Sequence, residues 1–437
     1  IKHKKKYGNS DFVAESVMRS ILNPVLMSEI RELGNDNLYE EVFAKINSRI
    51  DTGDAIKRDR TTNVYYQKKS GLIPNVTAFH NFIKSNLMYT YFTALHTGKR
   101  LRIFDVGTGR GGDIDKFYYV LAKEVVGIDP DVESLINSKE RSAQSSYERL
   151  KGRKANVPPM VFIHGDAGLL LKYDEQIKVP KSLSNDNKIR MEKYLNWDHP
   201  KMFDRMNSSF AIHYLLKSEE TWNNFQQNIN KFLREGGYFL FTTFDGDLVR
   251  EKLINNKGRI VEYYEDNGEK KILFDIVQKF DEDEKNKLGN TIDVHMAWIS
   301  ADDVYIPEYL VCKDFLVESM KKNCDMELVE TGSFEDIYKN CKNFLKISSF
   351  YEQSQRKKYF NKAYQYYEPT DFNQKCRKYT FLNRFYIFRK NERNLEENRQ
   401  KYYMSDNNRA TPGILANVKN KTNKFQYKGN KQKRQNK

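Results

Sequence analysis

The chain has 437 residues, of which 39% are hydrophobic and 13% aromatic, so it can build the core of one large domain or of two. No apolar run approaches the ~20 residues that cross a bilayer, and we therefore expect no membrane-spanning helix. The formal net charge of +15 favours a polyanionic partner, and nucleic acid is the first candidate.

The cysteines are widely spaced and form no C-x-x-C pair, so we expect no disulfide framework, no metal site and a reducing intracellular compartment. They are Cys312, Cys324, Cys341 and Cys376. The chain starts at Ile1 and no signal-peptide core follows. We therefore expect it to begin inside a longer polypeptide or after a removed tag.

Residues 1–70 are predicted to form a basic arm and a linker or helical appendage, with helical apolar spacing over Phe12–Ile21. The next helix is predicted over Val76–Leu95, just before a glycine-rich segment. Asn81 and Lys84 fall together on one face of that helix, beside its apolar face. This helix can therefore pack next to a ligand pocket formed by the glycine-rich segment.

A buried strand is predicted over Arg102–Val106, followed by a glycine-rich turn and by a helix that starts near Asp113. Gly107, Gly109 and Gly112 fit the G-x-G-x-x-G spacing, in which glycine permits a tight turn and a close approach of a ligand. Nicotinamide, flavin and S-adenosylmethionine (AdoMet) enzymes all use this spacing, so the glycines alone do not identify the ligand.

The acids around the loop favour AdoMet. Asp105 and Asp113 flank the loop and would repel a pyrophosphate, whereas they suit a ligand that carries an ammonium and a sulfonium. Asp129 ends the next predicted strand, where it can accept hydrogen bonds from two ribose hydroxyls. Asp166 ends a third strand and is placed to meet the adenine amino group. The alternative is a structural turn that binds no ligand.

Strands and helices alternate up to residue 244, which predicts an α/β, Rossmann-like fold with a mostly parallel sheet covered on both faces. Beyond the segments above, we expect a helix over 132–151, a polar surface insertion over 172–200, a strand over 203–210, a helix over 221–233 that stops at Gly236-Gly237, and a strand over 238–244.

An antiparallel lid is predicted at about 252–300, with a hairpin that turns near Asn267-Gly268. The segment Ile306–Val311 is expected to lead into a helix ending near Asn323, and the last strands lie near 326–329 and 381–388. Residues 71–390 would then form the main domain. We assign no secondary structure to the basic tail 391–437, whose final 19 residues hold eight Lys/Arg and no acid.

Four segments together resemble the mRNA cap guanine-N7 methyltransferases, most closely the C-terminal domain of poxvirus-type or giant-virus-type capping enzymes. The segments are Asn81–Ser85, Asp105–Asp113 with its Gly-Gly-Asp ending, Phe210–Tyr214, and Pro307–Val311. The likeness spans about residues 6–390, and Lys6–Asn9 resembles the linker after a guanylyltransferase module. The chain departs from the family pattern at Thr108, Arg110 and Ser209.

The resemblance implies a role for each matched residue. AdoMet would be bound by Lys84, Asp105, Gly107, Gly109, Asp113, Asp129, Asp166 and Ser209. The cap would be bound by Asn81, Arg110, Phe210, His213, Tyr214 and Glu308, and a further family tyrosine is placed at Tyr386. It also implies capped RNA as the partner, fused RNA triphosphatase and guanylyltransferase modules, a stimulatory subunit in some relatives, and a cytoplasmic viral factory or virion as the location.

Methylation of guanine N7 needs no general acid or base, because N7 already has a free lone pair and AdoMet is already activated. The protein has to align the two reactants. Glu308 would accept from the guanine N1–H and amino group, and Phe210 and Tyr214 would stack on or edge the base. Two alternatives stay open: a ribose 2′-O methyltransferase, for which we find no lysine-centred base set, and a non-catalytic RNA-binding subunit.

Overall fold

The structure, a computed structural model, describes residues 75–136, 141–177, 184–281, 288–300, 304–351 and 355–392. The predictions for the N-terminal arm and for the tail beyond Glu392 lie outside these residues. Within the described ranges, no helix combines the length and the apolar character needed to cross a membrane.

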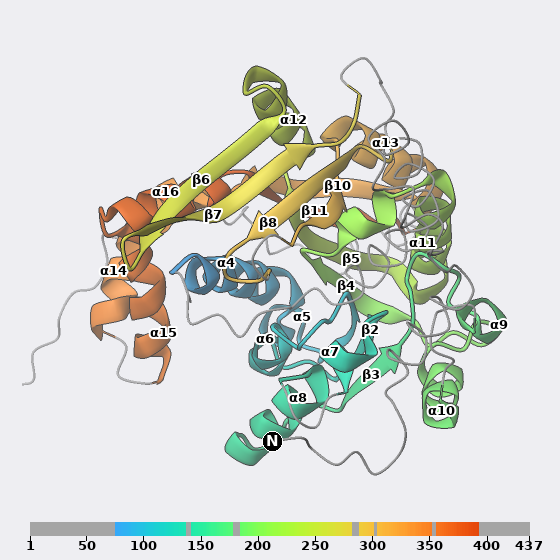
Figure 1. Ribbon diagram of the computed structural model, residues 1–437. Coiled ribbons are helices and arrows are strands. Elements are labelled where there is room, and N and C mark those ends of the chain that lie inside the picture. The colour runs from blue at the N-terminus through green and yellow to red at the C-terminus, as the bar shows by residue number, and fades with distance from the viewer. Residues whose placement is uncertain are drawn as a thin grey trace, which may run out of the picture. The chain divides into compact units, whose positions relative to one another are not determined.

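The main sheet has seven strands in the order β10-β11-β5-β4-β1-β2-β3. Five of its strands run parallel, and β11 and β10 pair antiparallel at one side (Figure 1). Their bounds are β1 Arg102–Val106, β2 Glu124–Asp129, β3 Met160–His164, β4 Phe203–Ser209, β5 Leu233–Phe244, β10 Met326–Ser333 and β11 Asn383–Lys390. The predicted α/β fold with a mostly parallel sheet is confirmed.

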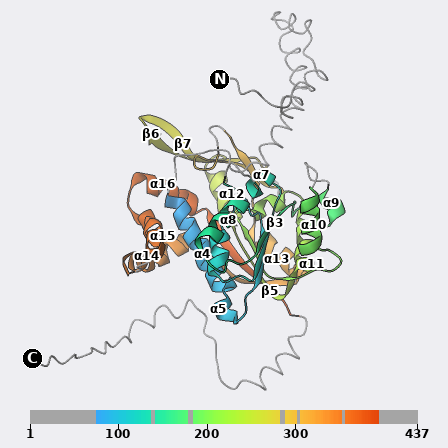
Figure 2. The same ribbon diagram turned by 90° about the horizontal axis from the view of Figure 1, so that it is seen from below.

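Two hydrophobic cores fill the two faces of this sheet, because neighbouring residues of a strand point to opposite faces. Ile103 packs into one core and Phe104 into the other. The first core includes α4 (Asn75–Phe92), α6 (Ile114–Tyr119) and α8 (Ala143–Arg153). The second includes α10 (Asn185–Tyr194), α11 (Glu219–Phe232) and α13 (Lys313–Cys324). Figure 2 shows these helices on either side of the strands.

Three local predictions need correction. The predicted helix over 132–151 is two helices, α7 (Val132–Leu135) and α8, and Ser142 caps α8 with a reciprocal capping box. The polar stretch over 172–200 contains α9 (Tyr173–Gln176) and α10, and α10 buries Met191 in the second core. Finally, α11 ends at Phe232, and Gly236-Gly237 lie inside β5.

The predicted lid is a second, antiparallel sheet of four strands in the order β6-β7-β8-β9. Its bounds are β6 Arg259–Asp266, β7 Glu269–Gln278, β8 Thr291–Met296 and β9 Ile306–Tyr309. Asn267 and Gly268 both have positive φ, +53° and +82°, as a two-residue hairpin turn requires. Glu308 lies in β9, and the helix to which this segment leads, α13, begins at Lys313.

Three helices between β10 and β11 were not predicted: α14 (Phe334–Tyr351), α15 (Gln355–Tyr364) and α16 (Asp371–Thr380). Helices α14 and α15 form a hairpin, and α15 packs on α4. The remaining elements are α5 Ala94–Thr97, α12 Gly246–Asn255, and the short 3₁₀ turns η1 Ile212–Leu216 and η2 Gln365–Tyr367. The helices α4, α14, α15 and α16 thus bring distant parts of the sequence to one side of the first core.

Candidate active site

The glycine loop joins β1 to α6 and has the tight geometry that its spacing predicts. Gly107 has φ of +76°, and a Cβ added there would lie 2.2 Å from the Cβ of Ala211. The amide N–H of Gly107 donates to the carbonyl of Ile128 at 2.9 Å, which ties the loop to the end of β2. A side chain at position 107 would therefore clash with the segment that leads into η1. Arg110 lies half-buried in the same loop.

Asp129 ends β2 and lies against this loop. One carboxylate oxygen accepts from the Gly109 amide at 2.8 Å, and the other accepts from the Asp131 amide at 2.9 Å. Burial raises the pKa of Asp129 to about 7. Each oxygen can accept a second hydrogen bond, so the carboxylate can still receive ligand hydroxyls.

Asp105 is the penultimate residue of β1 and is also buried. Its Oδ1 accepts from Asn207 Nδ2 at 2.6 Å, and Asn207 Oδ1 in turn accepts from Ser209 Oγ at 3.2 Å. Burial raises the pKa of Asp105 to about 7, with nearby Asp113 adding to the shift. Ser209 is thus connected to Asp105 through Asn207.

Asp113 lies at the centre of a cluster of charged side chains. Asp113 and Lys84 were predicted as site residues from the sequence, and Lys116 was not. The ammonium groups of Lys84 and Lys116 both lie 2.7 Å from its Oδ1. Burial acts to raise the pKa of Asp113, but the two lysines outweigh it and hold that pKa below its ordinary range. Lys116 also donates to Asn81 Oδ1 and to the Gly112 carbonyl, each at 2.8 Å.

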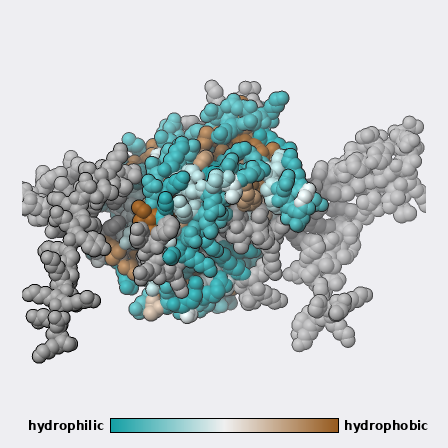
Figure 3. All heavy atoms as spheres, turned by 90° about the vertical axis from the view of Figure 1, so that its left-hand side faces the viewer, coloured by the Kyte–Doolittle hydropathy of each residue, from teal (hydrophilic) through white to brown (hydrophobic). Residues whose placement is uncertain are grey.

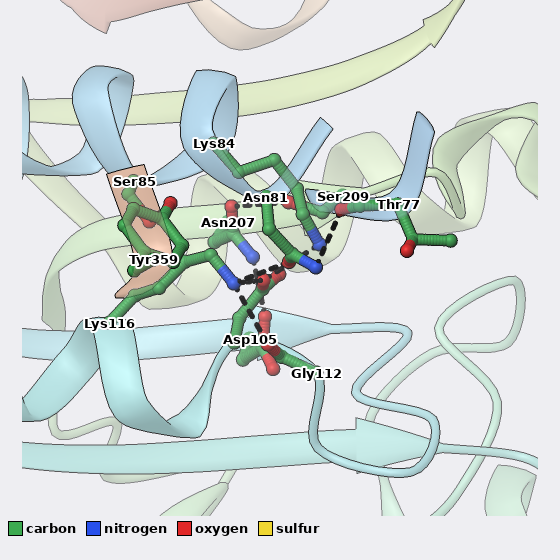
Figure 4. Close-up of polar contacts among 11 residues, drawn as sticks. Thr77, Asn81, Lys84, Ser85, Asp105, Gly112, Lys116, Asn207, Ser209 and Tyr359 are labelled. Carbon is green, nitrogen blue, oxygen red and sulfur yellow. Dashed lines mark hydrogen bonds and ion pairs between the residues drawn. The ribbon is translucent and has the colours of Figure 1, made fainter. Parts of the chain in front are cut away.

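Figure 4 shows Asn81 and Lys84 pointing from α4 toward Asp105, Gly112 and Lys116. Sequence reasoning missed Lys116, although it stands three residues after Asp113, a spacing at which helical side chains meet. Asn81 is held by Lys116 and by a bond from its Nδ2 to the Thr77 carbonyl at 2.9 Å. The cluster fixes α4 relative to the glycine loop.

Asp166 lies just after β3, so Asp105, Asp129 and Asp166 all lie at or next to the carboxyl ends of three neighbouring parallel strands. Its Oδ1 accepts from the Gly168 amide at 2.7 Å, and burial raises the pKa of its carboxyl. The carboxyl ends of parallel strands are where ligands bind in this fold class.

Phe210 directly follows β4 and contacts the aromatic side chains of the site. It has a positive φ of +56°, which is uncommon for a bulky residue and fixes the direction of the chain after β4. Its ring stacks on His80 at 5.5 Å between centroids and meets the edge of Phe334 at 6.0 Å. Lys84 Nζ lies 6.0 Å from its centroid. Phe210 therefore lies between the ion cluster and an aromatic pocket wall.

Glu308 and His213 form a buried pair, with Oε2 of Glu308 3.4 Å from Nε2 of His213. Burial raises the pKa of Glu308 to about 8 and lowers that of His213 to about 3, so both are largely neutral at pH 7. Neither ring nitrogen of His213 has a hydrogen-bond partner within the described ranges. The ring of Tyr214 lies 4.1 Å from that of His213.

The further tyrosine of this site is Tyr379. Burial raises the pKa of its hydroxyl, and the nearby carboxyl of Glu308 adds to the shift. Its ring packs edge-on against Trp298, with 5.2 Å between the ring centroids. Tyr386 instead lies in β11 and stacks on Phe241 at 5.0 Å inside the second core. Of these two tyrosines, Tyr379 is therefore the one that lies near Glu308.

The fold and the arrangement of these side chains together identify the class of protein. A parallel sheet with β11 and β10 antiparallel at its side, a glycine loop and acids at the carboxyl ends of β1, β2 and β3 characterise an AdoMet-dependent methyltransferase. The chemistry of the donor set fits AdoMet, because carboxylates match its ribose hydroxyls and its cationic groups. AdoMet is the methyl donor of this class.

Within this class, the chain can be assigned to a family. The model of the mRNA (guanine-N(7))-methyltransferase domain matches residues 55–368, and the chain belongs to that family. The chain is 35% identical over 386 residues to a probable mRNA-capping enzyme of Acanthamoeba polyphaga mimivirus, covering 88% of this chain and 30% of the relative.

More distant relatives carry related names. An mRNA-capping enzyme of African swine fever virus is 26% identical over 64% of this chain and 29% of its own length. An mRNA cap guanine-N(7) methyltransferase of Aspergillus niger is 26% identical over 43% of this chain and 32% of its own length. The chain thus spans about a third of the length of these curated relatives.

Proposed function

We propose that this chain transfers the methyl group of AdoMet to N7 of the guanine that caps an mRNA. The observation that carries the proposal is the buried carboxyl of Glu308, which lies 3.4 Å from the His213 ring nitrogen and close enough to the Tyr379 hydroxyl to interact with it electrostatically. A buried acceptor is costly unless a ligand satisfies it. Guanine offers two donors on one edge, N1–H and the amino group, and adenine does not.

In this proposal the two halves of the site have separate tasks. Asp129 accepts hydrogen bonds from the ribose hydroxyls, and Asp166 accepts one from the adenine amino group. Both residues lie at the ends of parallel strands. Lys84, Asp105 and Asp113 hold the methionine end of the donor, and Ser209 steadies Asn207 beside Asp105. When bound, AdoMet supplies a methyl group already activated by its sulfonium.

The acceptor half orients the guanine. Phe210 and Tyr214 contact the base. Glu308 and His213 face its polar edge. Arg110 and Asn81 are assigned to the triphosphate bridge, which would run along the glycine loop. Positive charge moves from sulfur to the guanine during transfer, and a carboxylate and aromatic faces near the base favour that shift. Alignment of the reactants supplies the rest of the rate increase.

The test is methyl transfer by this chain alone to capped RNA, with chromatographic identification of the methylated nucleoside. We expect 7-methylguanosine. A 2′-O-methyl product would instead make the chain a ribose methyltransferase, and an absence of transfer together with no binding of S-adenosylhomocysteine would favour a non-catalytic RNA-binding subunit.

We extend the proposal to the whole protein by resemblance. The relatives called mRNA-capping enzymes are about three times longer than the matched region. Upstream RNA triphosphatase and guanylyltransferase modules would supply the unmethylated cap, and the cytoplasm of an infected cell would be the location. A stimulatory subunit is a further partner to be tested by adding it to the same assay.

A further inference from the structure

The hairpin of α14 and α15 carries a basic surface that the proposed cap chemistry does not use. Between Ile337 and Tyr364 the sequence has seven Lys/Arg and a single acid, Glu352. Within this segment, the lysines with exposed side chains are Lys339, Lys342, Lys346, Lys357, Lys358 and Lys362. Because like charges on one surface repel, such a cluster suits a polyanion.

The lysines of α14 lie on one face of the helix, since their spacing is three and then four residues. Lys339 pairs with Glu335 at 2.8 Å. Lys342 and Lys346 are exposed, and neither has an ion pair with a residue in the described part of the chain. Lys342 Nζ lies 5.9 Å from the centroid of the Tyr367 ring, a contact that leaves its charge accessible from solvent. On α15, Lys357, Lys358 and Lys362 are likewise exposed.

Aromatic side chains lie among these charges. Phe344 is 53% exposed although it is a large apolar residue, and its ring meets the edge of Phe360 from α15 at 6.0 Å. Ile347, one turn further along, is 59% exposed. Figure 3 shows the side of the molecule on which α14 and α15 lie, with hydrophobic spots on a mainly hydrophilic surface. A basic surface with exposed aromatic rings is how proteins bind single strands without reading their sequence.

The hairpin is joined to the methyl-transfer site at two points. Phe334, the first residue of α14, meets the rings of Phe210 and His80. Tyr359 of α15 donates to Ser85 Oγ at 3.0 Å, next to Lys84. With a rise of 1.5 Å per residue, Lys342 and Lys346 lie about 12 and 18 Å along α14 from Phe334. That distance is the reach of the first few nucleotides behind a cap.

We propose that the α14–α15 hairpin binds the 5′-terminal nucleotides of the RNA whose cap lies in the methyl-transfer site. Lysines of both helices contact phosphates, and Phe344 stacks on a base. This inference rests on the proposed function for the identity of the RNA end. The hairpin gives affinity without sequence preference, as an enzyme that acts on every transcript requires.

The test compares a Lys342→Glu/Lys346→Glu double variant and Phe344→Ala with a matched control, Lys321→Glu/Lys322→Glu. The control changes two exposed lysines of α13 in the same way. KM is measured for a capped RNA of about ten nucleotides and for the cap dinucleotide GpppG, and thermal melting checks that each variant folds. Fluorescence anisotropy of a labelled RNA measures binding independently of activity.

We expect the double variant to raise KM for capped RNA roughly tenfold and to leave KM for GpppG unchanged. The log–log salt slope of RNA binding should fall by about 1.4, or about 0.7 for each of two phosphates that lysine no longer neutralises. Phe344→Ala should weaken RNA binding several-fold without changing the salt slope. The control should resemble the unchanged protein.

Equal KM values for RNA in the double variant and the control would overturn the inference, and so would an equal loss on RNA and GpppG. If the variant binds RNA normally but loses stimulation by an added subunit, the surface binds a protein and the inference is wrong. If the unchanged protein methylates neither capped RNA nor GpppG, the proposed function fails, while anisotropy still decides whether the hairpin binds RNA.

Discussion

The donor half and the acceptor half of the site are built in opposite ways. Around the glycine loop, the carboxylates of Asp105, Asp113 and Asp129 each have hydrogen bonds or ion pairs from the protein itself. In the pocket of Glu308 and His213, two buried polar groups face each other, and the His213 ring nitrogens make no hydrogen bond with a described residue. A network satisfied in advance holds its shape without ligand, whereas the second pocket depends on the ligand to satisfy it.

The largest effect expected from this difference is that of Glu308→Gln. The change keeps the size of the side chain but gives a group that cannot ionise and that replaces one acceptor by a donor, so one N–H of guanine would face another N–H. We expect a loss of about 3–4 kcal/mol in kcat/KM on capped RNA, with AdoMet affinity nearly unchanged. Steady-state kinetics and calorimetry measure the two quantities. Methylation close to that of the unchanged protein would contradict the guanine-reading role.

Asp129→Ala should show the opposite pattern, with donor binding lost and cap binding kept. Each ribose hydroxyl loses a charged acceptor worth about 1.5–3 kcal/mol, and the Gly109 amide loses its partner as well. Calorimetric titration with S-adenosylhomocysteine measures the change. Asp115→Ala, an exposed acid of α6, is the matched control. An unchanged affinity in a folded Asp129→Ala protein would make Asp129 only a strand-end residue.

The pH dependence of cap binding should also separate the halves. Burial raises the pKa of Glu308 to about 8, and the ionised form is the acceptor that guanine needs. Below pH 8 the protonated fraction grows, so cap affinity should fall by up to about tenfold per pH unit, and above pH 8 it should be level. His213, with a pKa of about 3, does not titrate in this window.

This pH profile is best measured by titrating GpppG in the absence of AdoMet, because Asp105 and Asp129 have pKa values of about 7 and would affect donor binding. Glu308→Gln should have a flat profile. A profile of the unchanged protein that is flat between pH 6 and pH 8 would show that Glu308 does not meet the guanine as a carboxylate.

The smallest effect is expected from removal of Lys419–Lys437, a segment that contains none of the residues assigned to either half of the site. The eight positive charges of this segment should contribute to RNA affinity, so the log–log salt slope should fall by about 0.7 for each phosphate that the tail would otherwise neutralise. Methylation of GpppG should not change. An unchanged salt slope would mean that the tail does not bind RNA.

The difference between the donor half and the acceptor half also explains which site residues could be predicted from the sequence. Asp105, Asp113 and Asp129 follow local rules, since each stands at a fixed distance from a strand end or a glycine, and the structure places all three around the glycine loop. The acceptor pocket joins α4, η1, β9 and α16, which are far apart in the chain. No local spacing predicts that Tyr379 and not Tyr386 lies beside Glu308, because only tertiary packing brings α16 there.

The close approach of Gly107 and Ala211 has a thermodynamic consequence. A Cβ at position 107 would come within 2.2 Å of the Ala211 side chain, so the loop for the donor and the segment that carries Phe210 and His213 pack directly on each other. A ligand that orders one of them restrains the other, which makes the two binding equilibria interdependent. Such linkage is reciprocal: whatever factor the donor contributes to cap affinity, the cap contributes to donor affinity. Cap affinity measured with and without S-adenosylhomocysteine would therefore give both the size and the sign of this linkage.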